Sequence, residues 1–175
     1  MRIGIDARFF GFKVGIGRYT EKLIEHLEKN DNHNDYFIFL TKKGFNEYQP
    51  ANQRFNKVLA NDRWYSFKEQ ILFPLRLYEK RLEMVHFLHF NVPLLYFGRF
   101  AVTIHDLTQR NLSKEASKLP LVIFWLKKAM YYLVIKTALK KAKKIIAISN
   151  FTKEELIRYY NIKSEKIIVI YESAE

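Results

Sequence analysis

The chain has 175 residues, 49% of them hydrophobic, with only six glycines and four prolines, so it is long enough for one domain with a sizeable core and does not read as disordered or low-complexity. It contains no cysteine, which excludes disulfides and thiolate metal sites. The formal net charge of +12 makes polyanions, such as anionic lipid or nucleic acid, partners to be considered. The apolar run at the N-terminus is too short for a signal peptide, so we expect a cytoplasmic protein.

The first half of the chain predicts a strand, a glycine loop and a helix, followed by two more strands. Residues 2–6 (RIGID) form a short apolar run that leads into a loop with three glycines. An apolar face with helical spacing follows over residues 17–30, and glutamates occupy the other side. Apolar runs at residues 35–41 and 56–60 predict the next strands, and residues 42–53 between them are expected to form a polar loop.

The second half continues the alternation of strands and helices. Ser66 and Glu69 form a capping box that predicts the start of a helix over residues 66–82, which Pro74 should kink. A second capping box, Thr152 and Glu155, is expected in the helix at residues 150–161. The remaining apolar runs are expected to be buried strands at residues 84–88, 100–105, 143–149 and 166–171.

Because these strands are apolar throughout and do not alternate, helices should cover both faces of the sheet. The order of elements predicts a Rossmann-like, three-layer α/β/α domain with a mainly parallel sheet.

A long basic helix is expected between the fifth and sixth strands. Residues 118–144 hold eight lysines and no acid, interleaved with bulky apolar residues. No apolar run is long enough to span a bilayer. Two interpretations remain open: a helix lying on a membrane, or a core helix whose lysines extend to water. The residues expected at a membrane surface are Lys127, Lys128, Lys136, Lys140, Lys141, Lys143 and Lys144.

The candidate chemistry lies where predicted strands end, because ligands of parallel sheets bind at the carboxyl ends of the strands. His105 and Asp106 directly follow the run AVTI. His86 and His89 are three residues apart, but the sequence offers no third ligand nearby, so we expect no metal site. The glycine loop lacks the spacing of dinucleotide and Walker motifs, and it suits either a phosphate or sugar hydroxyl at a helix start or a simple turn.

Five motifs in order carry a resemblance to a known family. GIDAR, GIGRYTEKLIEHL, VHFLHFNVPLL, VTIHDLT and IIAISNFTKEEL together resemble the N-terminal domain of GT-B glycosyltransferases of the group 1 or family 4 type. The match runs along essentially the whole chain and is weakest over residues 40–83. It implies that residues 1–175 are the acceptor-side domain, that residues 171–175 begin the linker, and that the donor-binding domain is absent. Glu172 stands where the family usually has asparagine.

The resemblance implies transfer of a sugar, with retained anomeric configuration, from a nucleoside diphosphate sugar to a lipid-linked or cell-surface glycan, without a metal or another cofactor. His105 would lie near the reacting sugar, and Asp106 would orient its imidazole or the loop behind it. The glycine loop would approach the donor phosphates, and HFNVP, with Pro93, would line the acceptor side. The implied substrate- and phosphate-binding residues are Gly15, Gly17, Arg18, His89, Asn91, Ser149, Asn150 and Thr152.

The family's second domain supplies an acidic pair and the basic residues that hold the diphosphate, and Glu154 and Glu155 do not replace them. We therefore expect the chain alone to be inactive, and to associate with the missing domain or with itself through the exposed face. An anionic membrane on the cytoplasmic side is a further expected partner. The alternatives are a non-catalytic binding or regulatory module and a basic nucleic-acid-binding module. We expect no nucleic acid, because the aromatic residues look like core and no such motif occurs.

Overall fold

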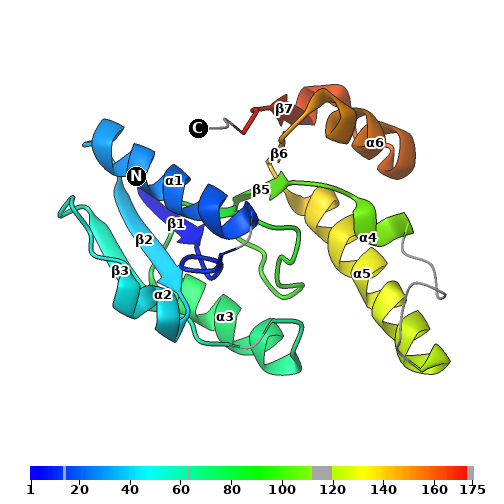
Figure 1. The fold of residues 1–175 in the computed structure, drawn as a ribbon, viewed down its shortest axis with the longest axis horizontal. Helices are drawn as coiled ribbons and strands as arrows, with labels where there is room; N and C mark the ends of the chain where they lie inside the picture. Colours follow the sequence, from blue (N-terminus) through cyan, green and yellow to red (C-terminus); the bar gives the residue numbers. More distant parts are fainter. Residues whose placement is uncertain (14, 63, 112–119, 173–175) are drawn as a thin grey trace.

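The structure, a computed structural model, describes residues 1–13, 15–62, 64–111 and 120–172. Its helices are α1 (Gly15–Asn30), α2 (Lys42–Glu47), α3 (Phe67–Glu79), α4 (Thr108–Asn111), α5 (Leu121–Lys141) and α6 (Asn150–Tyr160). Its strands are β1 (Arg2–Asp6), β2 (Asp35–Leu40), β3 (Phe55–Leu59), β4 (Met84–Phe87), β5 (Phe100–Ile104), β6 (Lys144–Ala147) and β7 (Ile167–Val169). Figure 1 shows how these elements are arranged.

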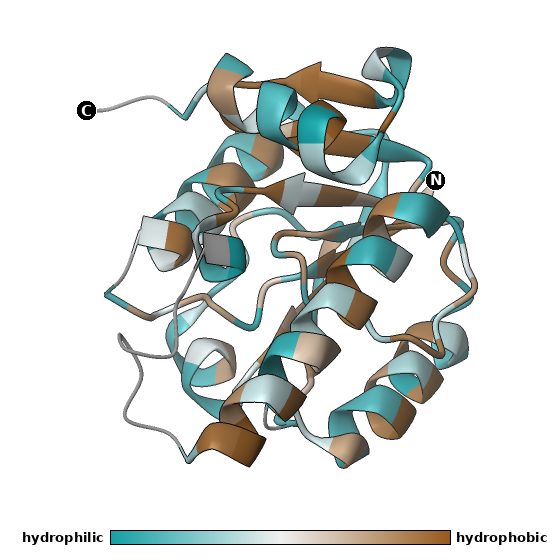
Figure 2. Ribbon diagram, turned by 90° about the vertical axis from the view of Figure 1, so that its right-hand side faces the viewer, coloured by the Kyte–Doolittle hydropathy of each residue, from teal (hydrophilic) through white to brown (hydrophobic). Residues whose placement is uncertain are grey.

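Within the described residues, seven strands form one sheet in the order β3-β2-β1-β4-β5-β6-β7, and every pair is parallel. Alternate residues of β2 point to opposite faces: Ile38 packs in the cluster that contains Ile24 of α1, and Phe39 packs in the cluster that contains Phe73 of α3. Helices α5 and α6 contribute to the second cluster. The sheet is therefore covered on both faces, and Figure 2 shows its largely brown strands lying between helices of mixed colour.

The predicted Rossmann-like, three-layer architecture is confirmed. One element differs: residues 42–53 were expected to form a loop, but α2 occupies residues 42–47. Thr41 caps this helix by accepting a hydrogen bond from the Gly44 backbone N–H at 3.4 Å. The added Cβ of any other residue at Gly44 would lie 3.1 Å from the Phe10 carbonyl oxygen, so close packing against the β1–α1 loop fixes this short helix.

The predicted capping box in the last helix is also wrong. Helix α6 begins at Asn150, and its N-cap is Ser149, whose hydroxyl accepts from the Thr152 backbone N–H at 3.1 Å. The Thr152 hydroxyl donates instead to the backbone carbonyl of His105 at 3.2 Å, because the amino end of α6 lies against the end of β5. Ser66 caps α3 as predicted, and that helix continues past Pro74 to Glu79.

Candidate functional site

The parallel sheet brings several of the predicted polar residues to one edge. Because the neighbouring strands β1, β4, β5 and β6 all run the same way, their carboxyl ends lie side by side. Asp6 ends β1, His89 follows β4, His105 follows β5 and Ser149 follows β6. This is the edge at which open α/β sheets bind their ligands.

His105 is held from both sides. Its Nε2 lies 2.9 Å from the Leu88 carbonyl oxygen, and its Nδ1 lies 2.8 Å from Oε1 of Glu172. The two contacts, one on each ring nitrogen, fix the plane of the imidazole ring. Tyr19 of α1 places its ring edge-on at 5.0 Å between centroids. The side chain of His105 is 17% exposed, which leaves one part of the ring accessible.

Asp106 supports the loop after β5. Among the described residues, no hydrogen bond joins its carboxylate to the imidazole of His105. Its carboxylate accepts a hydrogen bond from the backbone N–H of Thr108 at 2.8 Å, at the start of α4. The orientation of the His105 ring is set by Leu88 and Glu172. Of the two roles expected for Asp106, the geometry fits the one in the loop behind the histidine.

A buried ion network underlies the same edge, and the sequence pattern alone did not reveal it. The Arg8 guanidinium binds both carboxylate oxygens of Asp6, through Nε at 2.7 Å and Nη2 at 2.8 Å, and it binds Oε1 of Glu69 at 2.7 Å. Burial on its own would lower the pKa of Arg8, but the carboxylates of Asp6 and Glu69 outweigh it and raise the pKa. Burial raises the pKa of the Glu69 carboxyl, and Arg8 opposes this shift.

The network fixes Asn91, one of the predicted acceptor-side residues. Its Nδ2 donates to Oε1 of Glu69 at 2.9 Å, and its backbone N–H donates to Nδ1 of His89 at 3.3 Å. Within the described part of the chain, the buried Oδ1 of Asn91 and the buried indole N–H of Trp64 have no hydrogen-bond partner. One is an acceptor and the other a donor, the pair of functions that a sugar hydroxyl satisfies.

Aromatic rings line this part of the edge. Phe9 stacks on Trp64 with centroids 4.7 Å apart, and it lies 5.3 Å from the ring of His89. Burial, followed by the charge of His105, lowers the pKa of His89 to about 4, so His89 is neutral near pH 7. His86 has the same shift from the same causes, to about 4. Its Nε2 pairs with the Thr103 hydroxyl at 2.8 Å inside the sheet, which is a structural role.

The glycine loop borders a hollow whose lining does not include His105. Gly15, Arg18, Lys13 and Glu21 take part in lining a hollow of about 660 Å³ at the start of α1. Gly17 is buried, and an added Cβ would lie 2.0 Å from the Phe12 carbonyl oxygen, so its lack of a side chain is required by the loop itself.

The residues at the start of α6 join β5 to the end of the described chain. Thr152 contacts the backbone of His105, as described above, and Ser149 caps the helix. Asn150 donates from Nδ2 to the Tyr171 hydroxyl at 2.8 Å. Because Tyr171 precedes Glu172, these contacts hold the segment that places a carboxylate on His105.

The seven lysines predicted at a membrane surface do not form one group. Lys127 and Lys128 lie in the exposed first half of α5, and Lys128 is 5.6 Å from the centroid of Trp125. Lys141 donates to the Leu94 carbonyl oxygen at 3.0 Å. The other four take part in lining a pocket at the far end of the helix, namely Lys136, Lys140, Lys143 and Lys144.

The two halves of helix α5 differ in burial. Its second half is a core helix, because Val134, Ile135, Ala138 and Leu139 are buried. Its first half exposes large apolar side chains, with Val122 at 78% and Trp125 at 56%. No helix in the described ranges is long and apolar enough to cross a membrane. Nor do any three His, Asp or Glu side chains among these residues gather as metal ligands would.

Solved structures with the same fold include two glycosyltransferases. One is the crystal structure of a glycosyltransferase from Rickettsia africae ESF-5, which is 18% identical with a TM-score of 0.57, the match covering 98% of this chain and 42% of that one. Another is the lipopolysaccharide outer core galactosyltransferase WaaB in its apo form, 17% identical with a TM-score of 0.56, the match covering 99% of this chain and 46% of that one. The chain thus spans less than half the length of these proteins.

The Rossmann-like sheet and the likeness to these two solved structures show that the chain has the fold of a GT-B domain. Glycosyltransferase Family 4 matches residues 14–173, and the chain belongs to that family. No curated protein sequence matches the chain.

Proposed function

We propose that the chain is the N-terminal, acceptor-side half of a retaining glycosyltransferase, and that its polar edge binds the sugars that react. In the proposed reaction, the bond between the anomeric carbon and the diphosphate oxygen breaks, a bond to an acceptor hydroxyl oxygen forms, and the hydroxyl proton is released. The observation that carries the proposal is His105, which directly follows β5 at the ligand-binding edge and has both ring nitrogens in contact with acceptor oxygens. Membership of Glycosyltransferase Family 4 supports it.

The acceptor is proposed to bind beside His105, along Phe9, Trp64 and Asn91. The stacked rings of Phe9 and Trp64 provide an apolar wall, and the unpartnered polar atoms of Trp64 and Asn91 suit hydroxyl groups. The neutral ring of His89 adjoins this wall. A lipid-linked or cell-surface glycan is the proposed class of acceptor, and a nucleoside diphosphate sugar is the proposed donor.

The diphosphate of the donor needs cationic or hydrogen-bonding groups while negative charge develops on it. The match covers less than half of each of the two solved glycosyltransferases. We therefore propose that a second domain, beginning after residues 171–175, supplies these groups and that the 175-residue chain is inactive alone. Sugar transfer from a panel of nucleoside diphosphate sugars by the purified chain would contradict this.

The first half of α5 is proposed to dock on an anionic membrane at the cytoplasmic side. Its exposed apolar residues and Lys127 and Lys128 combine the two features of an interfacial helix, and its opening turn is brown in Figure 2 where it follows the grey trace. The charge of +12 favours anionic over neutral lipid.

Vesicle sedimentation tests this docking. We expect binding to vesicles that contain phosphatidylglycerol, weaker binding to phosphatidylcholine alone, and loss of binding at high salt. Replacing Val122 and Trp125 by serine should remove binding. The matched control is Phe67→Ser in α3, where the side chain is 90% exposed, and this variant should still bind. Dimerisation without vesicle binding would show that α5 covers a second copy of the chain, and would contradict the proposal.

A further inference from the structure

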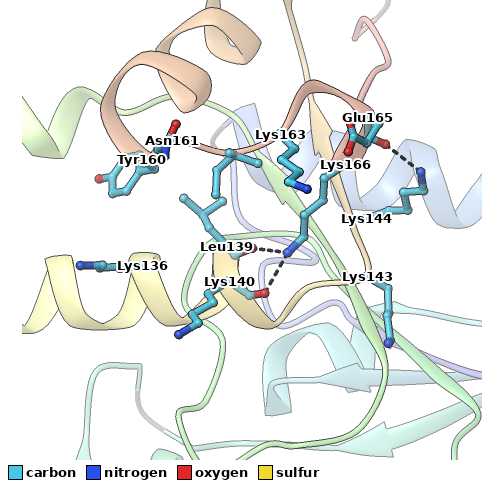
Figure 3. A pocket seen from close by; sticks show the side chains of 11 residues that line it. Lys136, Leu139, Lys140, Lys143, Lys144, Tyr160, Asn161, Lys163, Glu165 and Lys166 are labelled. Atoms are coloured by element: carbon cyan, nitrogen blue, oxygen red, sulfur yellow. Dashed lines mark hydrogen bonds between the residues drawn. The ribbon is translucent and has the colours of Figure 1, made fainter.

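A pocket of about 540 Å³ lies at the edge of the sheet opposite His105. The last turns of α5, the residues that begin β6 and the connection from α6 to β7 form its walls (Figure 3). These are the amino ends of β6 and β7, whereas His105 follows the carboxyl end of β5. Nothing in the proposed transfer reaction uses this pocket, so an inference about it stands independently of that reaction.

The pocket is strongly basic. Its lining contains one acidic residue, Glu165, and six lysines, which are Lys136, Lys140, Lys143, Lys144, Lys163 and Lys166. In Figure 3 these side chains come from α5, from the segment that begins β6 and from the α6–β7 connection. Six ammonium groups around one hollow create a positive potential that attracts an anion with several charges.

Two of the lysines hold the walls together. Lys166 Nζ donates to the carbonyl oxygens of Leu139 and Lys140, at 2.7 and 2.8 Å, and thereby caps the carboxyl end of α5. Lys144 Nζ donates to the Glu165 carbonyl oxygen at 2.9 Å. These bonds link α5, β6 and the residues before β7, so the shape of the pocket is built into the fold.

The other four lysines have no such structural bond. Within the described part of the chain, the side chains of Lys136, Lys140, Lys143 and Lys163 form no ion pair with a carboxylate, and all four are exposed. Burial, and next the charge of Lys143, lower the pKa of Lys166, as expected where ammonium groups are crowded without anions. A bound anion would offset this repulsion.

Neither the helix macrodipole nor a nucleic-acid groove accounts for the whole cluster of lysines. The macrodipole favours cations at the end of α5, which accounts for Lys140 and Lys166 but not for Lys163 on the opposite wall. Single-stranded nucleic acid needs a groove with aromatic rings for successive bases, and Tyr160 is the one aromatic residue among those that line the pocket. A concave space of this size is typical of small-molecule sites.

We propose that this lysine pocket binds a multiply charged phosphate group. The group is either part of a free polyphosphorylated compound or the head group of an anionic lipid, because both present the same chemistry to the lysines. Lys136, Lys140, Lys143 and Lys163 contact the phosphate oxygens, while Lys144 and Lys166 keep the walls in place.

Calorimetric titration with sodium tripolyphosphate at physiological ionic strength tests the proposal. We expect saturable binding with one site per chain, weakened at least tenfold by the double variant Lys140→Gln and Lys163→Gln. The matched control is Lys42→Gln with Lys68→Gln, which removes the same charge from exposed positions outside the pocket and should leave binding unchanged. Equal weakening by both variants, or the absence of saturable binding, would overturn the proposal.

The two sources of phosphate are distinguished by a second arm and a pH measurement. Binding to vesicles containing phosphatidic acid that tripolyphosphate displaces, and that the pocket variant loses, identifies the lipid head group. Tripolyphosphate binding without vesicle binding identifies a free compound. In either case binding raises the lowered pKa of Lys166, so in the alkaline range where Lys166 titrates, binding should be accompanied by proton uptake at Lys166, measured as a dependence of the enthalpy on the buffer that Lys166→Met removes.

Discussion

Replacing Arg8 by methionine should destabilise the chain far more than removing an ion pair on the surface. Arg8 is 1% exposed and Glu69 is fully buried, so the change leaves the carboxylates of Asp6 and Glu69 without their cation in the interior. Breaking a buried pair in this way costs about 3–5 kcal/mol. Divided by a urea slope of about 2 kcal/mol/M, a loss of about 4 kcal/mol lowers the unfolding midpoint by about 2 M.

The matched control is Arg54→Met. Arg54 pairs with Asp35 at 2.9 Å, but both side chains are nearly half exposed, so the loss should be at most about 1 kcal/mol. Urea unfolding followed by tryptophan fluorescence measures both. If Arg8→Met does not fold, Glu69→Gln provides a second comparison, because glutamine still accepts from Arg8 and loses mainly the bond from the Tyr65 N–H, for a cost of about 1 kcal/mol.

The destabilisation by Arg8→Met should also depend on pH. Burial already raises the pKa of Glu69, and removing the guanidinium takes away what opposes this shift, so between the unfolded and folded pKa values of Glu69 the folded variant binds more protons than the unfolded chain. Its stability therefore falls as pH rises, and the difference from the unaltered chain should be larger at pH 7 than at pH 5. A midpoint shift for Arg8→Met no larger than that for Arg54→Met would refute the reasoning.

Three further changes test separate parts of the structure by the same unfolding measurement. Gly17→Ala should cost about 1–3 kcal/mol because its Cβ meets the Phe12 carbonyl, whereas Gly15→Ala, with open space around its Cβ, should cost little; equal costs would contradict this. Ser149→Ala should cost about 1 kcal/mol by removing the cap of α6, and Ser164→Ala much less. Stability should fall as pH drops from 6.5 to 4, because His86 becomes protonated in the unfolded chain but stays neutral in the folded chain. His86→Gln should flatten this dependence of stability on pH. An unchanged dependence would count against a buried, neutral imidazole.

The sheet could be predicted from the sequence because its strands are continuous apolar runs of β-branched and aromatic residues. Local pattern also placed Ser66 at the start of α3. The local pattern failed at α2, a six-residue helix that contains Gly44. This glycine is needed for close packing against the β1–α1 loop, which the local sequence does not reveal. The local pattern failed again at α6, because serine and threonine are both good N-cap residues, and the contact that engages the Thr152 hydroxyl comes from His105, which is distant in the sequence.

The site was predicted in part, for a similar reason. His105 and Asn91 follow strands and could be found from the strand pattern. The pairing of Arg8 with Glu69 joins residues 61 positions apart, so nothing local predicts it, although Asp6 and Arg8 in GIDAR were a visible signal of a charged pair at a strand end. The partner of His105 was missed for the same reason, because Glu172 lies 67 positions after His105 in the sequence.

The basic helix shows a different kind of error. Counting lysines along the sequence suggested one charged surface, but the first and last turns of a 21-residue helix are about 30 Å apart. The structure therefore separates the apolar first half from the lysine pocket at the other end, and it adds Lys163 and Lys166 from a distant part of the chain.

The most direct test of the central proposal is nucleoside diphosphate release by the native protein that contains this chain. The protein is immunoprecipitated from its own cells and supplied with a panel of nucleoside diphosphate sugars and a membrane extract as acceptor, and the His105→Asn form is compared with the unaltered one. The account predicts sugar-dependent release that the substitution lowers at least a hundredfold while the amount of folded protein stays the same. Release that is equal in both forms would contradict it.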